Sequence, residues 1–153
     1  MSSVAVQVAD AIAAELNARP ALWAPQSFTA VRAWLPVTQL EKFSGLQVTA
    51  TPNAIVLGEL RARDKRREYH YRRDVVIQAK VADAGNASCD PFSLLAEQIG
   101  DHFAGLTLPA YAGPGGAAVV TSALVDPECY HEWLDAYRVF ATVVQMTVLL
   151  VRP

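Results

Sequence analysis

The chain has 153 residues, 52% of them hydrophobic, and its formal net charge at pH 7 is -2. This composition excludes a disordered chain, which would have fewer apolar residues and a higher charge. The apolar content suffices for one core, so we predict a single domain, residues 1–153. The longest strongly apolar run without a charge, residues 139–151, is too short to cross a bilayer as a helix.

The first third of the chain predicts one helix and two strands. Apolar residues four apart indicate a helix that ends before Pro20: Val4, Val8, Ile12 and Leu16. The alternation in residues 28–35 predicts a strand that ends at Pro36. Residues 46–51 alternate apolar and polar side chains, which predicts a half-buried strand, and residues 55–57 extend it past a kink.

The clearest strand of the sequence is residues 69–82. Its side chains alternate between apolar and polar, and only Arg73 and Val76 break the pattern. We expect this strand to pair with residues 46–57 as an antiparallel hairpin whose long loop is rich in arginine.

A second helix is predicted for residues 91–103. Asp90 precedes Pro91, which is the order expected of an N-cap residue and the first helical position. Apolar residues then recur along one helical face: Phe92, Leu95, Ile99 and Phe103.

The last third predicts a strand, a short helix and a final strand. Residues 118–125 are apolar and strand-like, and the Asp126-Pro127 pair favours a helical turn or two over residues 128–135. Residues 137–151 are so apolar that we expect cover on both faces, from the sheet centre or from a neighbouring subunit. The predicted fold is α+β, a mainly antiparallel sheet of four to five strands with two helices packed on it.

Local catalytic and metal-binding motifs are weak. Cys129 and His131 are two apart, and three residues elsewhere could complete a zinc site: Cys89, His70 and His102. Ordinary side chains around a short helix explain this pattern better, because structural zinc sites usually show paired ligands at short spacing. We also expect Asp101-His102 to be exposed near a helix end.

Five carboxylates could form acid and base pairs: Glu97, Asp101, Glu128, Glu132 and Asp135. Glu97 and Asp101 share one helix face without interrupting the apolar stripe, so we expect them to be solvated. We predict no catalytic residue, no cofactor and no metal, and therefore not an enzyme.

The remaining candidate is a protruding basic arm, residues 58–74. Residues 59–74 hold seven of the 13 basic residues and four of the 15 acidic ones, a local charge of +3. The predicted interaction residues are Arg61, Arg63, Lys65, Arg66, Arg67, Arg72 and Arg73. The arm could be a solvated hairpin tip, dock on an acidic protein face, or contact nucleic acid. The pI near 5.9 argues against a dedicated nucleic-acid binder.

Several segments, taken in order, resemble the tail-terminator (tail-completion) proteins of long-tailed bacteriophages. The segments that carry the resemblance are VADAIAAELNA, FTAVRAWLPVTQLEKFSGLQVTATP, the arginine-rich stretch before RDVVIQAKV, DPFSLLAEQIGDHF and DPECYHEWLDAYRVFATVVQMTVLL. The resemblance covers most of the chain and contains no invariant motif. Residues 107–118, rich in glycine and proline, have no counterpart in it.

The resemblance implies a structural virion protein, located in the tail neck and made in the host cytoplasm. Such a protein forms a ring, usually of six subunits, that caps the tail tube and joins it to the head-side connector. The implied partners are further copies of the chain, the tube protein, the connector or stopper, and transiently DNA in the lumen. Neither a membrane nor a small-molecule substrate is implied. The alternatives are another neck protein such as a head-tail stopper, a small nucleic-acid-binding module, and an enzyme whose pocket is built from distant residues.

Overall fold

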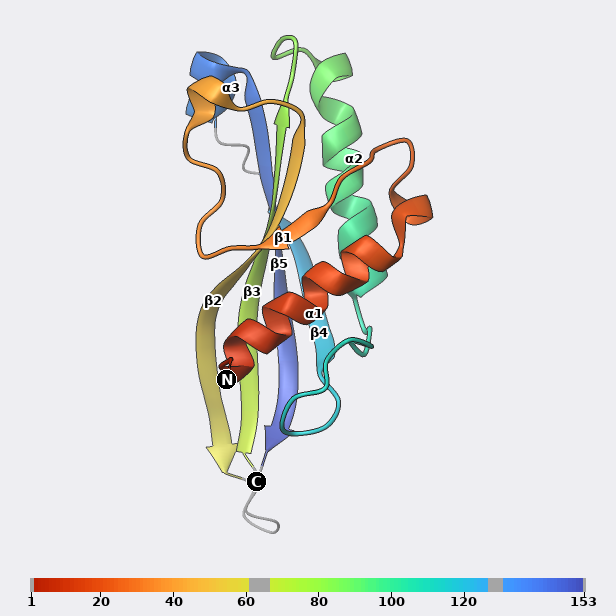
Figure 1. Cartoon of the computed structure of the whole chain (residues 1–153), viewed down its shortest axis with the longest axis vertical. Helices are drawn as coiled ribbons and strands as arrows, with labels where there is room; N and C mark the ends of the chain where they lie inside the picture. Colours follow the sequence, from red (N-terminus) through yellow and green to blue (C-terminus); the bar gives the residue numbers. More distant parts are fainter. Residues whose placement is uncertain (1, 61–66, 127–130, 153) are drawn as a thin grey trace.

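The computed structural model describes the backbone of residues 2–60, 67–126 and 131–152, and their side chains except at 53–60, 67, 151 and 152. In chain order its elements are helix α1 (Val4–Ala18), 3-10 turn η1 (Pro20–Trp23), strand β1 (Ala30–Arg32), 3-10 turn η2 (Leu40–Lys42), strands β2 (Leu46–Leu60) and β3 (Arg67–Lys80), helix α2 (Asn86–Phe103), strand β4 (Val119–Asp126), helix α3 (His131–Tyr137) and strand β5 (Val139–Arg152). The described strands form one sheet in the order β1-β2-β3-β5-β4 (Figure 1). Strand β1 runs parallel to β2 and the other neighbours are antiparallel, which confirms the predicted α+β class.

The β2–β3 hairpin confirms the predicted pairing of the two middle strands. Strand β2 continues past Pro52, where the register shifts so that Ile55 is the next residue paired with β3. Proline has no N–H for the ladder, so an irregularity at this point is expected. Strand β3 also pairs with β5 along its whole length, from Arg67 to Lys80. Residues 67–74, which the sequence placed in a protruding arm, therefore lie between two strands of the sheet.

Helices α1 and α2 cover the same face of the sheet (Figure 1). The apolar stripes predicted for both helices form the core, with several members fully buried: Val8, Ile12, Leu95, Ile99 and Phe103. The approach of α2 to the sheet is close, because a Cβ atom added to Gly100 would lie 3.2 Å from Val125 Cγ2. Beyond these helices, β2, β3 and β5 continue as a narrow ribbon toward the hairpin end (Figure 1).

Among the described residues, the cover on the opposite face of the sheet lies near α3. There Leu40, Phe43 and Val139 form a second small core, against which Trp133 and Tyr137 pack. Further along β5 on this face, three side chains are half-buried: Gln145, Thr147 and Leu149. The predicted cover on both faces of the last strand is therefore confirmed near α3, and toward the hairpin end cover by a neighbouring subunit stays a prediction.

Helix α2 begins at Asn86, five residues before the predicted start, and Pro91 lies inside it. Asp83 explains the earlier start, because its Oδ1 accepts hydrogen bonds from the Gly85 N–H (2.7 Å) and from the Ser88 hydroxyl (3.0 Å). This carboxylate holds the first turn of the helix in place. Asp90, the predicted N-cap, is instead an exposed residue within the helix.

The first predicted strand is also shorter than expected. The pattern at residues 28–35 predicted eight residues of strand, whereas β1 contains three, Ala30–Arg32. Because β1 pairs only with β2 and lies at the edge of the described sheet, few backbone hydrogen bonds extend it.

Replacing Asp83 with asparagine is expected to lower the free energy of unfolding at pH 7. The Gly85 N–H and the Ser88 hydroxyl lower the pKa of Asp83 below its ordinary value of 3.8. A lowered folded-state pKa means that the carboxylate stabilises the fold above its unfolded pKa, and that this contribution is lost as the pH falls through the folded pKa. Urea denaturation should therefore show a difference between the two proteins at pH 7 that closes in acid. The control Asp90→Asn, at an exposed position within α2, should show little difference at either pH. A constant difference for Asp83→Asn would contradict the assignment.

Candidate functional site

The predicted basic arm is only partly visible in the structure. Four of its seven residues lie outside the described part of the chain: Arg61, Arg63, Lys65 and Arg66. The backbone of Arg67 begins β3, where it pairs with Arg152 of β5. Arg72 is exposed, and its guanidinium donates a hydrogen bond to Gln145 Oε1 (2.6 Å). This acceptor is the neutral amide oxygen of a glutamine on the neighbouring strand β5.

Arg73 is not an interaction residue of the surface, which corrects the sequence prediction. Its side chain is 0% exposed and lies on the helix-covered face of β3. One guanidinium nitrogen donates to the Ala5 carbonyl in α1 (3.0 Å), another donates to the Arg72 carbonyl, and the group stacks 5.3 Å from the Tyr71 ring. Burial lowers the pKa of Arg73 to about 10. Arg73 therefore links the start of α1 to the sheet.

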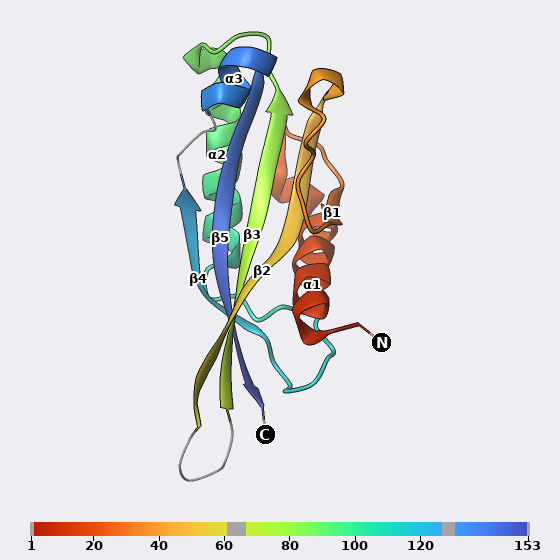
Figure 2. The same ribbon diagram turned by 90° about the vertical axis from the view of Figure 1, so that its left-hand side faces the viewer.

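An open sheet face lies on the side away from the helices, toward the hairpin end (Figure 2). We define it by His70, Arg72, Gln145, Thr147 and Leu124, which the strand register places on one face. Arg72 and Leu124 are exposed and the other three are half-buried. This face offers hydrogen-bond donors, the Arg72 guanidinium, the carboxylates of Glu68 and Asp74, and the apolar side chains of Leu124 and Leu149, which suits contact with another macromolecule.

A buried polar cluster joins the two main helices. Glu15 of α1 is 4% exposed, and its Oε1 lies 2.9 Å from His102 Nε2 and 3.2 Å from Arg19 Nε. The Glu15–His102 contact is short enough for a hydrogen bond between the two side chains. The His102 ring also meets the edge of Trp23 at 5.6 Å. His102 is thus a structural partner of Glu15, whereas the sequence indicated an exposed residue.

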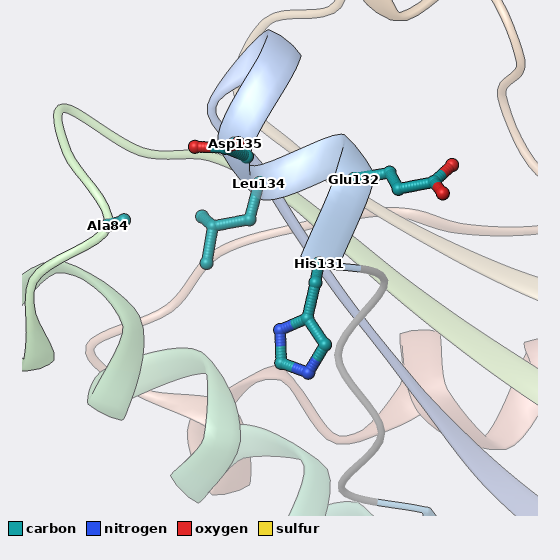
Figure 3. Close-up of a pocket in the computed structure, with 5 residues that line it drawn as sticks. All are labelled: Ala84, His131, Glu132, Leu134 and Asp135. Atoms are coloured by element: carbon teal, nitrogen blue, oxygen red, sulfur yellow. The ribbon is translucent and has the colours of Figure 1, made fainter.

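The pocket beside α3 does not gather catalytic groups. It has a volume of about 380 Å³ and lies against the loop before α2, with five lining residues: Ala84, His131, Glu132, Leu134 and Asp135. Figure 3 shows the polar side chains of this short helix pointing in different directions. Cys129 lies outside the described residues, and among those that are described no group of three or more His, Cys, Asp or Glu side chains is placed to hold a metal ion.

The predicted carboxylate pairs stay on the surface. Glu97 and Asp101 are exposed on α2, as the sequence indicated. Glu132 and Asp135 are exposed on α3, and Glu128 lies outside the described residues. The four described carboxylates are therefore in contact with solvent and do not line an enclosed site.

A larger groove separates η1 from α2. Its volume is about 490 Å³, and its walls are mostly apolar. The lining residues are Trp23, Ala24, Pro25, Gln26, Ala87, Asp90, Pro91, Leu94 and Gln98. Leu94 is 55% exposed although it is a large apolar residue in the middle of a helix. The sequence pattern did not indicate this groove, because its two walls come from segments that are far apart along the chain.

Comparisons with known proteins leave the family of the chain open. No model of a known protein family matches it. A comparison with curated proteins finds no match either. In the part of the chain that the structure describes, none of the helices is both long and apolar enough to span a membrane.

Replacing His102 with alanine is expected to destabilise the protein by about 1–3 kcal/mol, because the buried Glu15 carboxylate loses a hydrogen-bond donor. The matched control is Glu97→Ala, an exposed residue of the same helix, which should change the free energy of unfolding by less than about 0.5 kcal/mol. Both values come from urea denaturation at pH 7. Equal effects of the two substitutions would show that the Glu15–His102 contact does not stabilise the fold.

Proposed function

We propose that the chain is a structural subunit of a bacteriophage tail neck, a tail terminator that assembles as a ring on the end of the tail tube. Its function is then to bind other proteins, namely neighbouring copies of the chain, the tube protein and the head-side connector. The resemblance of the ordered segments, from the VADAIAAELNA helix to the final apolar strand, is the reason for choosing this class.

The observation that best supports an assembly role is the exposure of large apolar side chains at separate places. Trp34 and Leu35 are adjacent and 62% and 71% exposed, Leu94 borders the α2–η1 groove, and Leu124 is 64% exposed on the open sheet face. Single exposed apolar residues are common, but an adjacent Trp-Leu pair and an apolar groove are typical of surfaces that bind other proteins.

The ribbon at the hairpin end suits a second contact. The ribbon of β2, β3 and β5 runs past the two large helices (Figure 2), and it includes the described ends of the basic segment, residues 59–60 and 67–72. Residues 61–66 lie outside the described part of the chain. A positive segment in this place could face an acidic surface of the tube, an adjacent subunit or DNA that crosses the lumen.

The proposal is tested by the mass and shape of the assembled protein. Size-exclusion chromatography with light scattering, followed by negative-stain microscopy with and without purified tail tubes, should show rings or protein bound at tube ends. A different result would reject the terminator function in favour of a nucleic-acid-binding module: a monomer that never binds tubes but retards the migration of DNA at moderate salt. The double substitution Arg66→Ala/Arg67→Ala should then abolish this DNA binding. Binding to the connector without any binding to tubes would favour a head-tail stopper.

Replacing residues 61–66, here called the basic tip, should impair assembly without preventing folding. Leu60 and Arg67 are paired in the hairpin, so an Asn-Gly turn in place of residues 61–66 can join them. We expect the shortened protein to keep its circular dichroism spectrum and its cooperative unfolding, and to lose most of its binding to tube ends. The substitutions Arg61→Gln/Arg63→Gln should weaken this binding as well, because they remove two positive charges.

The matched control removes two exposed positive charges at the other end of the molecule, Lys80→Gln/Arg138→Gln, and should leave tube binding unchanged. Loss of the folded state in the shortened protein would show that the tip is structural. Unchanged tube binding in both arm variants would exclude the tip from the interface.

A further inference from the structure

Helix α3 lies on the second small core, at the end of the sheet where β5 begins (Figure 2). It has seven residues, and none of them is buried. Two half-buried aromatic side chains, Trp133 and Tyr137, pack against Leu40, Phe43 and Val139. A helix of this length is not stable by itself in water, so it depends on these contacts. By comparison, α1 and α2 each bury a whole stripe of side chains.

The side of α3 that faces the loop before α2 is not closely packed. The pocket of about 380 Å³ lies there, lined by Ala84 and by four side chains of the helix: His131, Glu132, Leu134 and Asp135 (Figure 3). Closely packed regions of a protein have few voids larger than a water molecule. Helix α3 is therefore packed on the second small core and open on the side toward this loop.

Arg138 joins α3 to β5 in a backbone conformation that residues with a side chain rarely adopt. Its φ angle is 54°, in the left-handed region. Its N–H donates to the Leu134 carbonyl of the helix (3.1 Å), whereas its carbonyl accepts from the Val81 N–H (2.9 Å), which directly follows β3. If the helix moved away, the φ angle could return to the ordinary negative range while the carbonyl kept its hydrogen bond. Arg138 is thus placed to act as a pivot.

A polar contact between α3 and β3 is open to water. The Lys80 ammonium donates to the Tyr137 carbonyl (2.5 Å), and Lys80 is exposed. Water can replace the partner of an exposed hydrogen bond, so the net contribution of such a bond to stability is small. This contact therefore adds little to the attachment of the helix.

The residues that α3 covers are apolar and buried. Val139 is 0% exposed, and Leu40 and Phe43 are also buried. Val139 and Gln145 are six residues apart on the regular strand β5, so their side chains lie on the same face of the sheet. Gln145 belongs to the open sheet face. Displacement of α3 would therefore add an apolar end to that face.

We propose that α3 is a lid that pivots at Arg138 and reversibly uncovers Leu40, Phe43 and Val139 while the main core stays folded. Local opening of this kind occurs where few buried apolar contacts hold an element in place. The apolar surface that the molecule can offer to a partner is then larger than the closed structure shows. This inference concerns the fold itself, and it holds whether or not the chain is a tail terminator.

The first test compares two fully buried valines of β5, Val139 under the lid and Val144 in the main core. Each is replaced separately, Val139→Cys or Val144→Cys, in a chain that carries Cys89→Ser and Cys129→Ser. The thiol at position 139 should react with a thiol reagent at least about tenfold faster than the thiol at position 144, because its cover opens without global unfolding. Its rate should depend little on low concentrations of urea, since local opening exposes little surface. Equal rates, or the same steep urea dependence at both positions, would overturn the proposal.

The second test weakens the attachment of the lid. Adding Trp133→Ala should speed the reaction of the thiol at position 139 and leave the rate at position 144 unchanged, because Trp133 packs on the second small core. The matched control is Glu132→Ala, an exposed residue of the same helix, which should change neither rate. Equal acceleration at positions 139 and 144 by Trp133→Ala would show that α3 opens only when the whole domain unfolds.

The third test uses the wild-type protein, so it does not depend on the folding of any variant. Amide hydrogen exchange measured by NMR should show that the Arg138 N–H is much less protected than the Val81 N–H, relative to their intrinsic rates. The reason is that the pivot breaks the hydrogen bond from Arg138 to Leu134 and keeps the one from Val81 to Arg138. Equal protection of the two amides would overturn the pivot at Arg138.

Discussion

The pairing of β3 with β5 is the contact on which the rest of this structure depends. It joins Arg67–Lys80 to Val139–Arg152 residue by residue without a register shift. The two strands are the central pair of the described sheet, and β2 and β4 are added on their outer edges. Because a shift by one residue would move every side chain to the other face, this register also decides which side chains meet the helices. The position of Arg73 under α1 and of Arg72 on the open sheet face both follow from it.

The periodic elements could be predicted from the sequence because their apolar residues recur at the period of their structure. The stripe from Val4 to Leu16 and the alternation around Val75 and Ile77 both indicated the correct element. The boundaries depended on polar contacts that periodicity does not reveal. Helix α2 starts at Asn86, directly after a turn in which the Asp83 carboxylate binds the Gly85 N–H and the Ser88 hydroxyl, whereas the Asp-Pro pair indicated a start at Pro91. The Asp-Pro pair therefore lies inside a helix that the preceding turn already begins.

The candidate surfaces were harder to predict because they combine distant residues. Arg73 breaks the alternation of its strand, and that break was the one available sign that its charge is buried. The pairing of Glu15 with His102 spans 87 residues, so no local pattern could indicate it. The α2–η1 groove needs a turn and a helix from different parts of the chain.

The long strand β3 separates the hairpin end of the molecule from the end beside α3. Strand β3 has 14 residues, which at about 3.3 Å per residue is about 46 Å. The screening length in physiological salt is about 8 Å, several times shorter than this distance. The electrostatic interaction through solvent between charges at the hairpin end and charges beside α3 is therefore negligible. Each end can be occupied, or altered by substitution, without changing the electrostatic attraction of the other end for its own partner.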